Sequence, residues 1–462
     1  MSQDQPLVIP FSLDEYGPAQ PLTEEFEFSK RLQFWDGPIR AFLSERGYTL
    51  NRFEIFGDKG STFGFMYPAL EFSPSAAPKD PRYAFVDTPT SFVSLTSKPF
   101  KYHIYGKVAF AQETSHPEKH IAVKLIRNDS PEYQIMKTLL EDADGRFIRG
   151  LVPVLDLFPF CGHWLAVTPR WGDDARAPWP STIGQALDLL EDALSGLAYL
   201  HERRIVHRVL NHLVLTFYLC VDIRQDISFS NMLTNHIPSQ RFSDVSDAMR
   251  SRLRNQRVLT LGLFDYNLSL VFPRDTPLEL ARSSYEDYFL GAWKPHLDVG
   301  HGEYQYNPFA VDVLGVGYII GRGFQHMTPV APILAPVIDG LVHWHPPSRL
   351  TAAAALDLLR TLKAEYGPGI VNLAAPTFQS MGYDELPLLE EFDRWKGLPE
   401  EFIARWKHLR TPPVPFHRRL LHFLCSYEPV SIVVRQLRRL VDASCSRTYV
   451  SLSTDDICEP QL

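Results

Sequence analysis

Two short stretches of this chain carry polar residues of the types that catalysis needs. The first ends in His207-Arg208, and the second begins at Asp226 and holds Asn231. If the 17 residues Val209–Gln225 are removed, the join reads His-Arg-Asp-Ile-Ser-Phe-Ser-Asn. In that order the aspartate can face a reacting hydroxyl as a base, and the asparagine five residues later can bind a divalent metal.

A lysine in a predicted strand could supply the positive charge for the same chemistry. Lys124 ends Ala-Val-Lys within the compact apolar segment His120–Ile126, which is typical of a β-strand. Taken alone, a surface lysine is the commoner interpretation. Apolar spacing predicts a helix over Glu132–Leu140, and Glu132 is the candidate ion-pair partner that would orient Lys124, with Glu141 as the alternative.

A second carboxylate follows a later strand. Val258–Phe264 is strand-like, and Asp265 comes directly after it. Magnesium prefers oxygen ligands, so Asp265 and Asn231 are the candidate metal ligands. The alternative for Asp265 is an Asx-turn at the end of a strand.

Composition narrows the class of protein. The chain has 462 residues, is 45% hydrophobic and carries a net charge of −8, which indicates no nucleic-acid partner. Five cysteines without a Cys-x-x-Cys pair favour reduced thiols over disulfides or a zinc site, and therefore an intracellular, cytoplasmic protein. The sequence shows neither a signal peptide nor an apolar run near the about 20 residues of a membrane span, so we expect no membrane association.

The order of the predicted elements favours an α+β fold of two lobes, in which a small β-rich lobe precedes a larger helical one. The predicted divisions are an N-terminal extension (1–82), the small lobe (83–168), the large lobe (169–362), a C-terminal helical extension (363–443) and a disordered tail (444–462). Helices are predicted over 183–201 (opened by a capping box of Thr182 and Gln185), 312–320, 351–362, 388–410 and 415–440.

With these motifs in place, residues 95–362 resemble the eukaryotic protein kinase fold. The likeness is greatest to a divergent group of fungal, chiefly basidiomycete, proteins with a protein-kinase domain. The segments that carry it are Pro169-Arg170-Trp171-Gly172, Asp265–Ser269 and Tyr306–Val313, besides the loop motif.

The resemblance implies that ATP and Mg²⁺ are cofactors and that the γ-phosphate passes to Ser or Thr hydroxyls of a protein substrate. It makes Asp226 the base, next to His207 and Arg208, and it implies that adenine meets backbone groups of Val167–Gly172, including Thr168 and Arg170. It further implies that Asp312 holds the backbone of the catalytic loop and that Arg349 is a structural arginine of the large lobe.

The chain also departs from the kinase pattern. Between Lys98 and Ala111, where a glycine-rich loop should bind phosphate, the sequence has only Gly106, and Lys107 would lend it charge. Asn267 replaces the glycine of the metal motif, and since asparagine tolerates the left-handed conformation the turn can persist. No Ala-Pro-Glu is found, and the activation segment expected over Ser269–Gln305 offers three phosphorylation candidates: Ser283, Ser284 and Tyr285.

The interruption of the catalytic loop has the features of a retained intron. Val209–Gln225 keeps the reading frame, can begin with GT in a valine codon and can end with AG in the glutamine codon CAG. It separates His207-Arg208 from Asp226 and carries an apolar run, Leu213–Val221. We expect the chain as written to be impaired and the spliced form to be competent.

Three functions follow from these patterns. The first is a Ser/Thr protein kinase, and the second is a pseudokinase that acts as a binding or scaffold module. The third, a small-molecule phosphotransferase of related fold, is disfavoured by the His-Arg before the aspartate. The basic cluster near the C-terminus is expected to be a solvated face; its members are His417, Arg418, Arg419, Arg435, Arg438 and Arg439.

Overall fold

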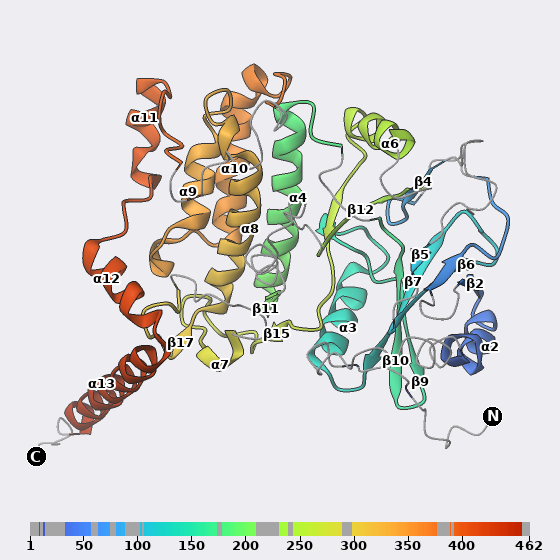
Figure 1. Ribbon diagram of the computed structural model, residues 1–462, viewed down its shortest axis with the longest axis horizontal. Coiled ribbons are helices and arrows are strands. Elements are labelled where there is room, and N and C mark those ends of the chain that lie inside the picture. The colour runs from blue at the N-terminus through green and yellow to red at the C-terminus, as the bar shows by residue number, and fades with distance from the viewer. Residues whose placement is uncertain are drawn as a thin grey trace, which may run out of the picture.

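A computed structural model gives the fold as α+β, with most strands of the first 170 residues at one side and most of the long helices that follow residue 182 at the other (Figure 1). The structure describes residues 9, 13, 33–56, 63–73, 80–87, 102–103, 106–172, 178–208, 231–238, 244–288, 298–376, 389 and 392–454. The predicted insertion 209–225 lies outside these residues.

The strands of the described residues form six sheets. Their bounds are β1 Tyr48–Leu50, β2 Arg52–Phe56, β3 Phe63–Tyr67, β4 Phe85–Val86, β5 Tyr102–His103, β6 Val108–Glu113, β7 His120–Arg127, β8 Gly150–Leu151, β9 Asp156–Phe160, β10 His163–Pro169, β11 Ile205–Val206, β12 Met232–Thr234, β13 His236–Ile237, β14 Leu261–Leu263, β15 Leu270–Val271, β16 Ser283–Ser284 and β17 Gln305–Tyr306.

Most helices are longer than the strands. The α-helices are α2 Pro38–Ser44, α3 Pro131–Ala143, α4 Ile183–Glu202, α6 Asp244–Asn255, α7 Tyr285–Tyr288, α8 Pro308–Phe324, α9 Leu334–Val342, α10 Ala352–Ile370, α11 Glu400–Trp406, α12 Phe416–Cys425 and α13 Glu428–Thr454, and the 3₁₀ turns are η2 Gln325–Met327, η3 Pro346–Ser348 and η6 Lys407–Leu409.

The largest sheet is antiparallel, in the order β1-β6-β7-β10-β9. Its central strand, β7, is the segment predicted from the apolar pattern, and Ile121, Val123 and Leu125 are fully buried on one face. In the turn between β9 and β10, Cys161 and Gly162 both have positive φ. The predicted limit of this lobe at residue 83 is wrong, because Tyr48–Leu50 forms an edge strand of the sheet.

A second correction concerns residues just after that limit. Strand β4 pairs in parallel with β13 and not with the large sheet. The Trp171 indole donates to the carbonyl of Arg82, 2.9 Å away, which fastens the same segment beside the end of β10. Residues 80–87 therefore join the helical side of the molecule to the strand side.

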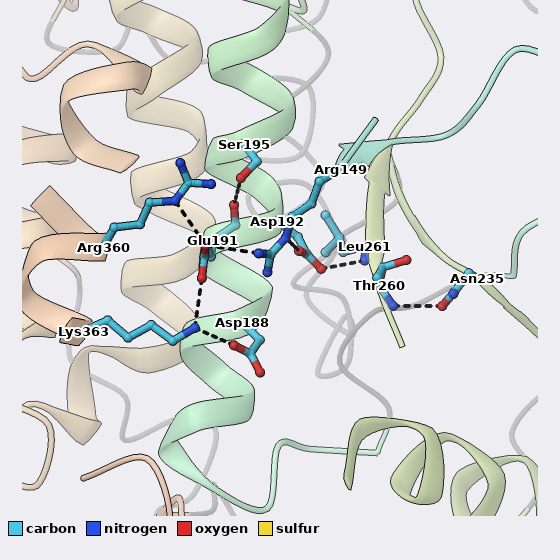
Figure 2. Close-up of polar contacts among 10 residues, drawn as sticks. All are labelled: Arg149, Asp188, Glu191, Asp192, Ser195, Asn235, Thr260, Leu261, Arg360 and Lys363. Carbon is cyan, nitrogen blue, oxygen red and sulfur yellow. Dashed lines mark hydrogen bonds and ion pairs between the residues drawn. The ribbon is translucent and has the colours of Figure 1, made fainter. Parts of the chain in front are cut away.

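Helix α4 lies between β14 and helix α10, and charged residues bind it to both sides (Figure 2). Arg149 binds Glu191 and Asp192 on α4, and Asp192 accepts the backbone N–H of Leu261, the first residue of β14. On the opposite side Lys363 of α10 binds Glu191, 2.9 Å away. These bonds set the position of β14, which leads directly into Asp265.

Two glycines allow α4 to approach β8 closely. A Cβ added at Gly196 would lie 2.1 Å from the carbonyl oxygen of Gly150, and a Cβ at Gly150 would lie 2.1 Å from the oxygen of Asp192. Both contacts are with backbone atoms, so a larger side chain cannot be accommodated by rotation alone.

We therefore expect Gly196→Ala to lower the free energy of unfolding by about 2–4 kcal/mol, because the backbone must move apart. Gly323→Ala is the matched control, since Gly323 is also helical and its added Cβ would have nothing within 4 Å. There the better helix propensity should give a change of about zero or a slight gain. Urea unfolding of both variants measures the difference, and equal midpoints would refute the packing argument.

One buried acid makes several of the bonds that hold the C-terminal extension against the helical part. Asp339 of α9 accepts from Arg394 Nε at 2.5 Å, from Trp395 Nε1 at 2.8 Å and from the backbone of Thr411 at 2.9 Å. Among the described residues, the predicted helix 388–410 contains α11 and the 3₁₀ turn η6, and the helix predicted over 415–440 is two helices, α12 and α13.

The expected disordered tail is also corrected in part. Helix α13 continues through Thr454, because a helix that is already nucleated gains one hydrogen bond for each residue added. Residues 455–462 lie outside the described residues. No helix in the described part of the chain has the length and apolarity to span a bilayer.

Candidate active site between the sheet and the helices

Lys124 lies at the centre of the candidate site and binds two carboxylates. Its Nζ atom is 2.6 Å from Oε1 of Glu132 and 2.6 Å from Oδ1 of Asp265. The ion pair predicted with Glu132 is therefore present, while the alternative Glu141 is exposed and lies 3.8 Å from Lys137. Lys124 comes from β7, Glu132 from the first turn of α3 and Asp265 from the segment after β14, so three distant parts of the sequence meet here.

Burial and neighbouring charges have opposite effects on the pKa values of Lys124 and Asp265. Burial alone would lower the pKa of Lys124, but the carboxylates of Glu132 and Asp265 outweigh it and raise that pKa. For Asp265, burial raises the pKa, and the Lys124 ammonium reverses this and holds it below the usual range. Both groups are thus charged at neutral pH, as nucleotide and metal binding would require.

The depressed pKa gives a prediction about stability and pH. A carboxylate whose pKa is lower in the folded state stabilises the fold above its ordinary pKa, about 4, and this contribution is lost as the pH falls through the folded pKa. We expect wild type to exceed Asp265→Asn in unfolding free energy by about 1–3 kcal/mol at neutral pH. Urea titrations should show this difference shrinking below about pH 4, and a difference that grows in acid would contradict the assignment.

Strand register brings the candidate metal ligands together. Met232 pairs with Leu263 in the antiparallel β12–β14 ladder, and one residue further on the carbonyl of Asn231 accepts the N–H of Phe264 at 3.3 Å. This bond places Asn231 beside Phe264, the residue that precedes Asp265. Asn231 is also buried. The predicted neighbourhood of Asn231 and Asp265 is thus present.

The conformation of the turn differs from expectation. Asp265 itself has a positive φ of 68°, whereas Asn267 is not among the residues with positive φ. An aspartate held in this sparsely populated region needs support from its surroundings, which Lys124 supplies. Asparagine replaces glycine at 267 without adopting the left-handed conformation.

The start of the predicted catalytic loop is held by Asp312, in the first turns of α8. Its two carboxylate oxygens accept the backbone N–H groups of His207 at 2.6 Å and Arg208 at 2.8 Å. The His201 ring lies 3.2 Å from the same carboxylate, and Asp312 is fully buried. The expectation that Asp312 holds the catalytic-loop backbone agrees with this geometry.

His207 links the loop to the metal segment. Its Nε2 donates to the carbonyl of Phe264 at 3.0 Å, so the proton of the neutral ring is on Nε2. Burial, which outweighs the nearby carboxylates of Asp312 and Asp265, lowers the pKa of His207. Arg208 follows with a positive φ of 60°.

Asp226, the predicted base, lies outside the described residues, so its position relative to the other site residues is not described. Arg349, the predicted structural arginine, is bound to a buried carboxylate. Arg349 makes two bonds of 2.8 Å to Asp298 and donates to the carbonyl of Ala310, and both charged side chains are buried.

The turn predicted to approach phosphate is fixed by a residue that the sequence did not indicate. The indole Nε1 of Trp35 donates to the carbonyl of Gly106 at 2.9 Å, and Trp35 is fully buried. The neighbouring Lys107 lies near enough to Asp265 to help lower its pKa. The N-terminal extension therefore takes part in the site, although nothing beyond its aromatic composition marked it.

Some backbone groups of the predicted adenine-binding segment already form hydrogen bonds within the protein. Thr168 is in register with Ala122 on β7, and the N–H of Arg170 donates to the carbonyl of His120 at 2.9 Å. The Arg170 guanidinium lies over the ring of Phe110, 4.2 Å from its centre, and Arg170 is buried. Arg170 therefore braces the sheet through these contacts.

Within the described ranges, no group of three or more His, Cys, Asp or Glu side chains could hold a metal ion. One aspartate and one asparagine can still suffice for Mg²⁺, which usually keeps several waters and takes further oxygens from substrate phosphates. The donor types of Asp265 and Asn231 fit that mode of binding. No model of a known protein family matches the chain, and a search of the curated proteins found no relative.

Proposed function

We propose that the protein is a Ser/Thr protein kinase, in which the sheet-bearing and helical parts are the small and large lobes. The observation that carries this proposal is the bridge from Lys124 to Glu132 and Asp265. A buried ammonium that is oriented by one carboxylate and adjacent to a second is what a nucleotide triphosphate with its metal needs. Lys124 would contact the phosphates, and Asp265 with Asn231 would hold Mg²⁺.

The remaining roles follow from the loop that Asp312 supports. Asp226 would accept the proton of a substrate hydroxyl, and His207 would keep its loop aligned with the metal segment through Phe264. Since the N–H groups of Arg170 and Gly172 already bond within the protein, we assign the adenine contact to the remaining backbone groups of Val167–Gly172.

The test is transfer of the γ-phosphate from ATP to a generic protein substrate by a chain that lacks Val209–Gln225. Turnover that Asp226→Asn abolishes supports the proposal. Turnover that persists unchanged in Asp226→Asn would overturn it. In parallel, sequencing transcripts across this junction tests the retained intron, and a transcript that keeps the segment in nearly all copies would refute that part.

A second candidate is a pseudokinase that binds partners without transferring phosphate. It is favoured by the turn at Gly106, which has one glycine where phosphate binding normally uses several. Nucleotide binding in the absence of any transfer by the shortened chain would select this candidate.

The Trp35 bond predicts a measurable part in nucleotide affinity. Trp35→Phe keeps a buried ring but removes the N–H that fixes Gly106, so we expect ATP to bind about 2- to 10-fold more weakly, the equivalent of one lost hydrogen bond. Trp344→Phe is the matched control, because its indole also donates to a carbonyl, that of Pro412 at 3.0 Å, on the C-terminal extension. Calorimetric titration with ATP measures the affinity of both variants. If Trp35→Phe binds ATP as tightly as Trp344→Phe, the indole bond does not support the site.

A further inference from the structure

The last two helices carry most of the large apolar side chains that are exposed among the described residues. Nine of them form two stripes, one along each helix, and their exposed fractions run from 37% to 73%. The stripe of α12 consists of Phe416, Leu420, Phe423, Leu424 and, just after the helix, Tyr427, and the stripe of α13 consists of Val430, Val433, Leu437 and Val441. The rings of Phe423 and Tyr427 are 5.8 Å apart and connect the two stripes. We call these nine residues the α12–α13 stripe.

The opposite face of α13 is polar and is the one that contacts the rest of the protein. The Arg435 guanidinium lies 3.4 Å from the ring centre of Tyr285, Arg439 binds Glu286 at 3.2 Å, and Arg438 is 3.8 Å from Glu303. A surface helix normally turns its apolar face inward and its charges outward. Here the arrangement is reversed, so the basic cluster is only in part the solvated face that was expected.

These contacts fix which way the stripe faces. Because the arginines are held by Tyr285, Glu286 and Glu303, α13 cannot rotate to bury its apolar side without breaking them. An exposed apolar surface of this extent on a folded protein marks an interaction site.

The size of the stripe suits a dimer. At about 100–200 Å² for each fully exposed apolar side chain, the exposed fractions give roughly 800 Å², which is about what one partner buries in a stable protein–protein interface. On α13 the residues 430, 433, 437 and 441 recur at steps of three and four, as in helices that pair along a narrow apolar seam.

The charges favour a second copy of this chain over a lipid surface. A helix that binds anionic lipid flanks its apolar face with lysines and arginines, but no lysine follows Lys407 in the chain. Three arginines of α13, Arg435, Arg438 and Arg439, are bound to the body, and Asp442 on the same helix accepts the Tyr304 hydroxyl at 2.7 Å. In a two-fold symmetric dimer the same patch of both copies meets, so any charge in the patch would face a like charge. The nine residues of the stripe are uncharged and can therefore pair with their own copy. We propose that the α12–α13 stripe is the interface of a symmetric homodimer.

The test is the mass of the full chain in sedimentation across the micromolar range. The proposal predicts twice the 52.8 kDa of one chain, and monomer for the double variant Phe423→Glu/Val433→Glu. Val330→Glu is the matched control, since Val330 is an exposed valine (38%) on the far connection before α9, and it should stay dimeric. Thermal melts show whether the double variant is folded.

Two results would overturn the proposal: a wild-type monomer at every concentration, or a dimer that survives Phe423→Glu/Val433→Glu. A monomer that floats with vesicles of anionic lipid would point to a membrane as the occupant and would equally refute the dimer. None of these outcomes depends on phosphoryl transfer, so the proposed function stands or falls separately.

Discussion

Replacing Lys124 by methionine is expected to reduce kcat/KM for phosphoryl transfer at least about 100-fold in the chain that lacks Val209–Gln225. Methionine fills the same space but removes the ammonium that lies 2.6 Å from both Glu132 and Asp265. Charge that develops on the phosphates then has no fixed cation from β7. Steady-state kinetics with a protein substrate measure the loss.

A control separates this effect from surface charge and from folding. Lys137→Met removes an exposed lysine of α3 whose only ion pair in the described structure is 3.8 Å long, and it should leave kcat/KM unchanged. Should Lys124→Met retain more than about half of wild-type kcat/KM while remaining folded, Lys124 has no part in transfer. The magnitude follows from loss of one preorganised cation at the reacting group.

Asp312→Ala is expected to have the largest effect on stability, about 3–5 kcal/mol. The carboxylate is fully buried and accepts from the backbones of His207 and Arg208 and from the His201 ring. Alanine would leave these donors buried without an acceptor, and an unsatisfied buried donor costs more than the bond itself contributes. Urea unfolding measures the change.

Asp312→Asn is the matched variant, because it keeps the shape and one acceptor oxygen. We expect it to lose roughly half as much as Asp312→Ala, since an amide satisfies one of the two backbone donors. A loss below about 1 kcal/mol in Asp312→Ala would mean that the loop is held by other contacts. Two such contacts are the bonds from His207 Nε2 to the carbonyl of Phe264 and from Ser269 Oγ to the carbonyl of His207.

Local patterns predicted the elements that carry the site. The apolar runs of β7 and α3 and the stripe of α4 are properties of short windows, and capping by Thr182 is confirmed by its bond from Gln185. The Lys124–Glu132 pair could also be predicted, because it depends on an adjacent strand and helix. Helix α9 was missed because it has only nine residues and no side-chain cap marks its start.

Contacts between distant segments could not be predicted in this way. Trp35 reaches Gly106 over 71 positions, and β1 joins the sheet from a part of the chain that reads as irregular. Likewise, the charges of α13 were expected in solvent, because sequence alone gives the two faces of a helix but not which one meets the protein. The residues that hold these arginines lie far away in sequence: Tyr285 for Arg435, Glu303 for Arg438 and Glu286 for Arg439.

The most direct test of the central claim is a thermal shift with Mg²⁺-ATP at millimolar concentration, on the chain without Val209–Gln225 and on its Asp265→Ala variant. If Lys124, Asp265 and Asn231 form one nucleotide–metal site, the wild-type melting temperature rises by about 2–4 °C and the variant does not respond. An equal rise in both proteins, or no rise in the wild type, contradicts the account.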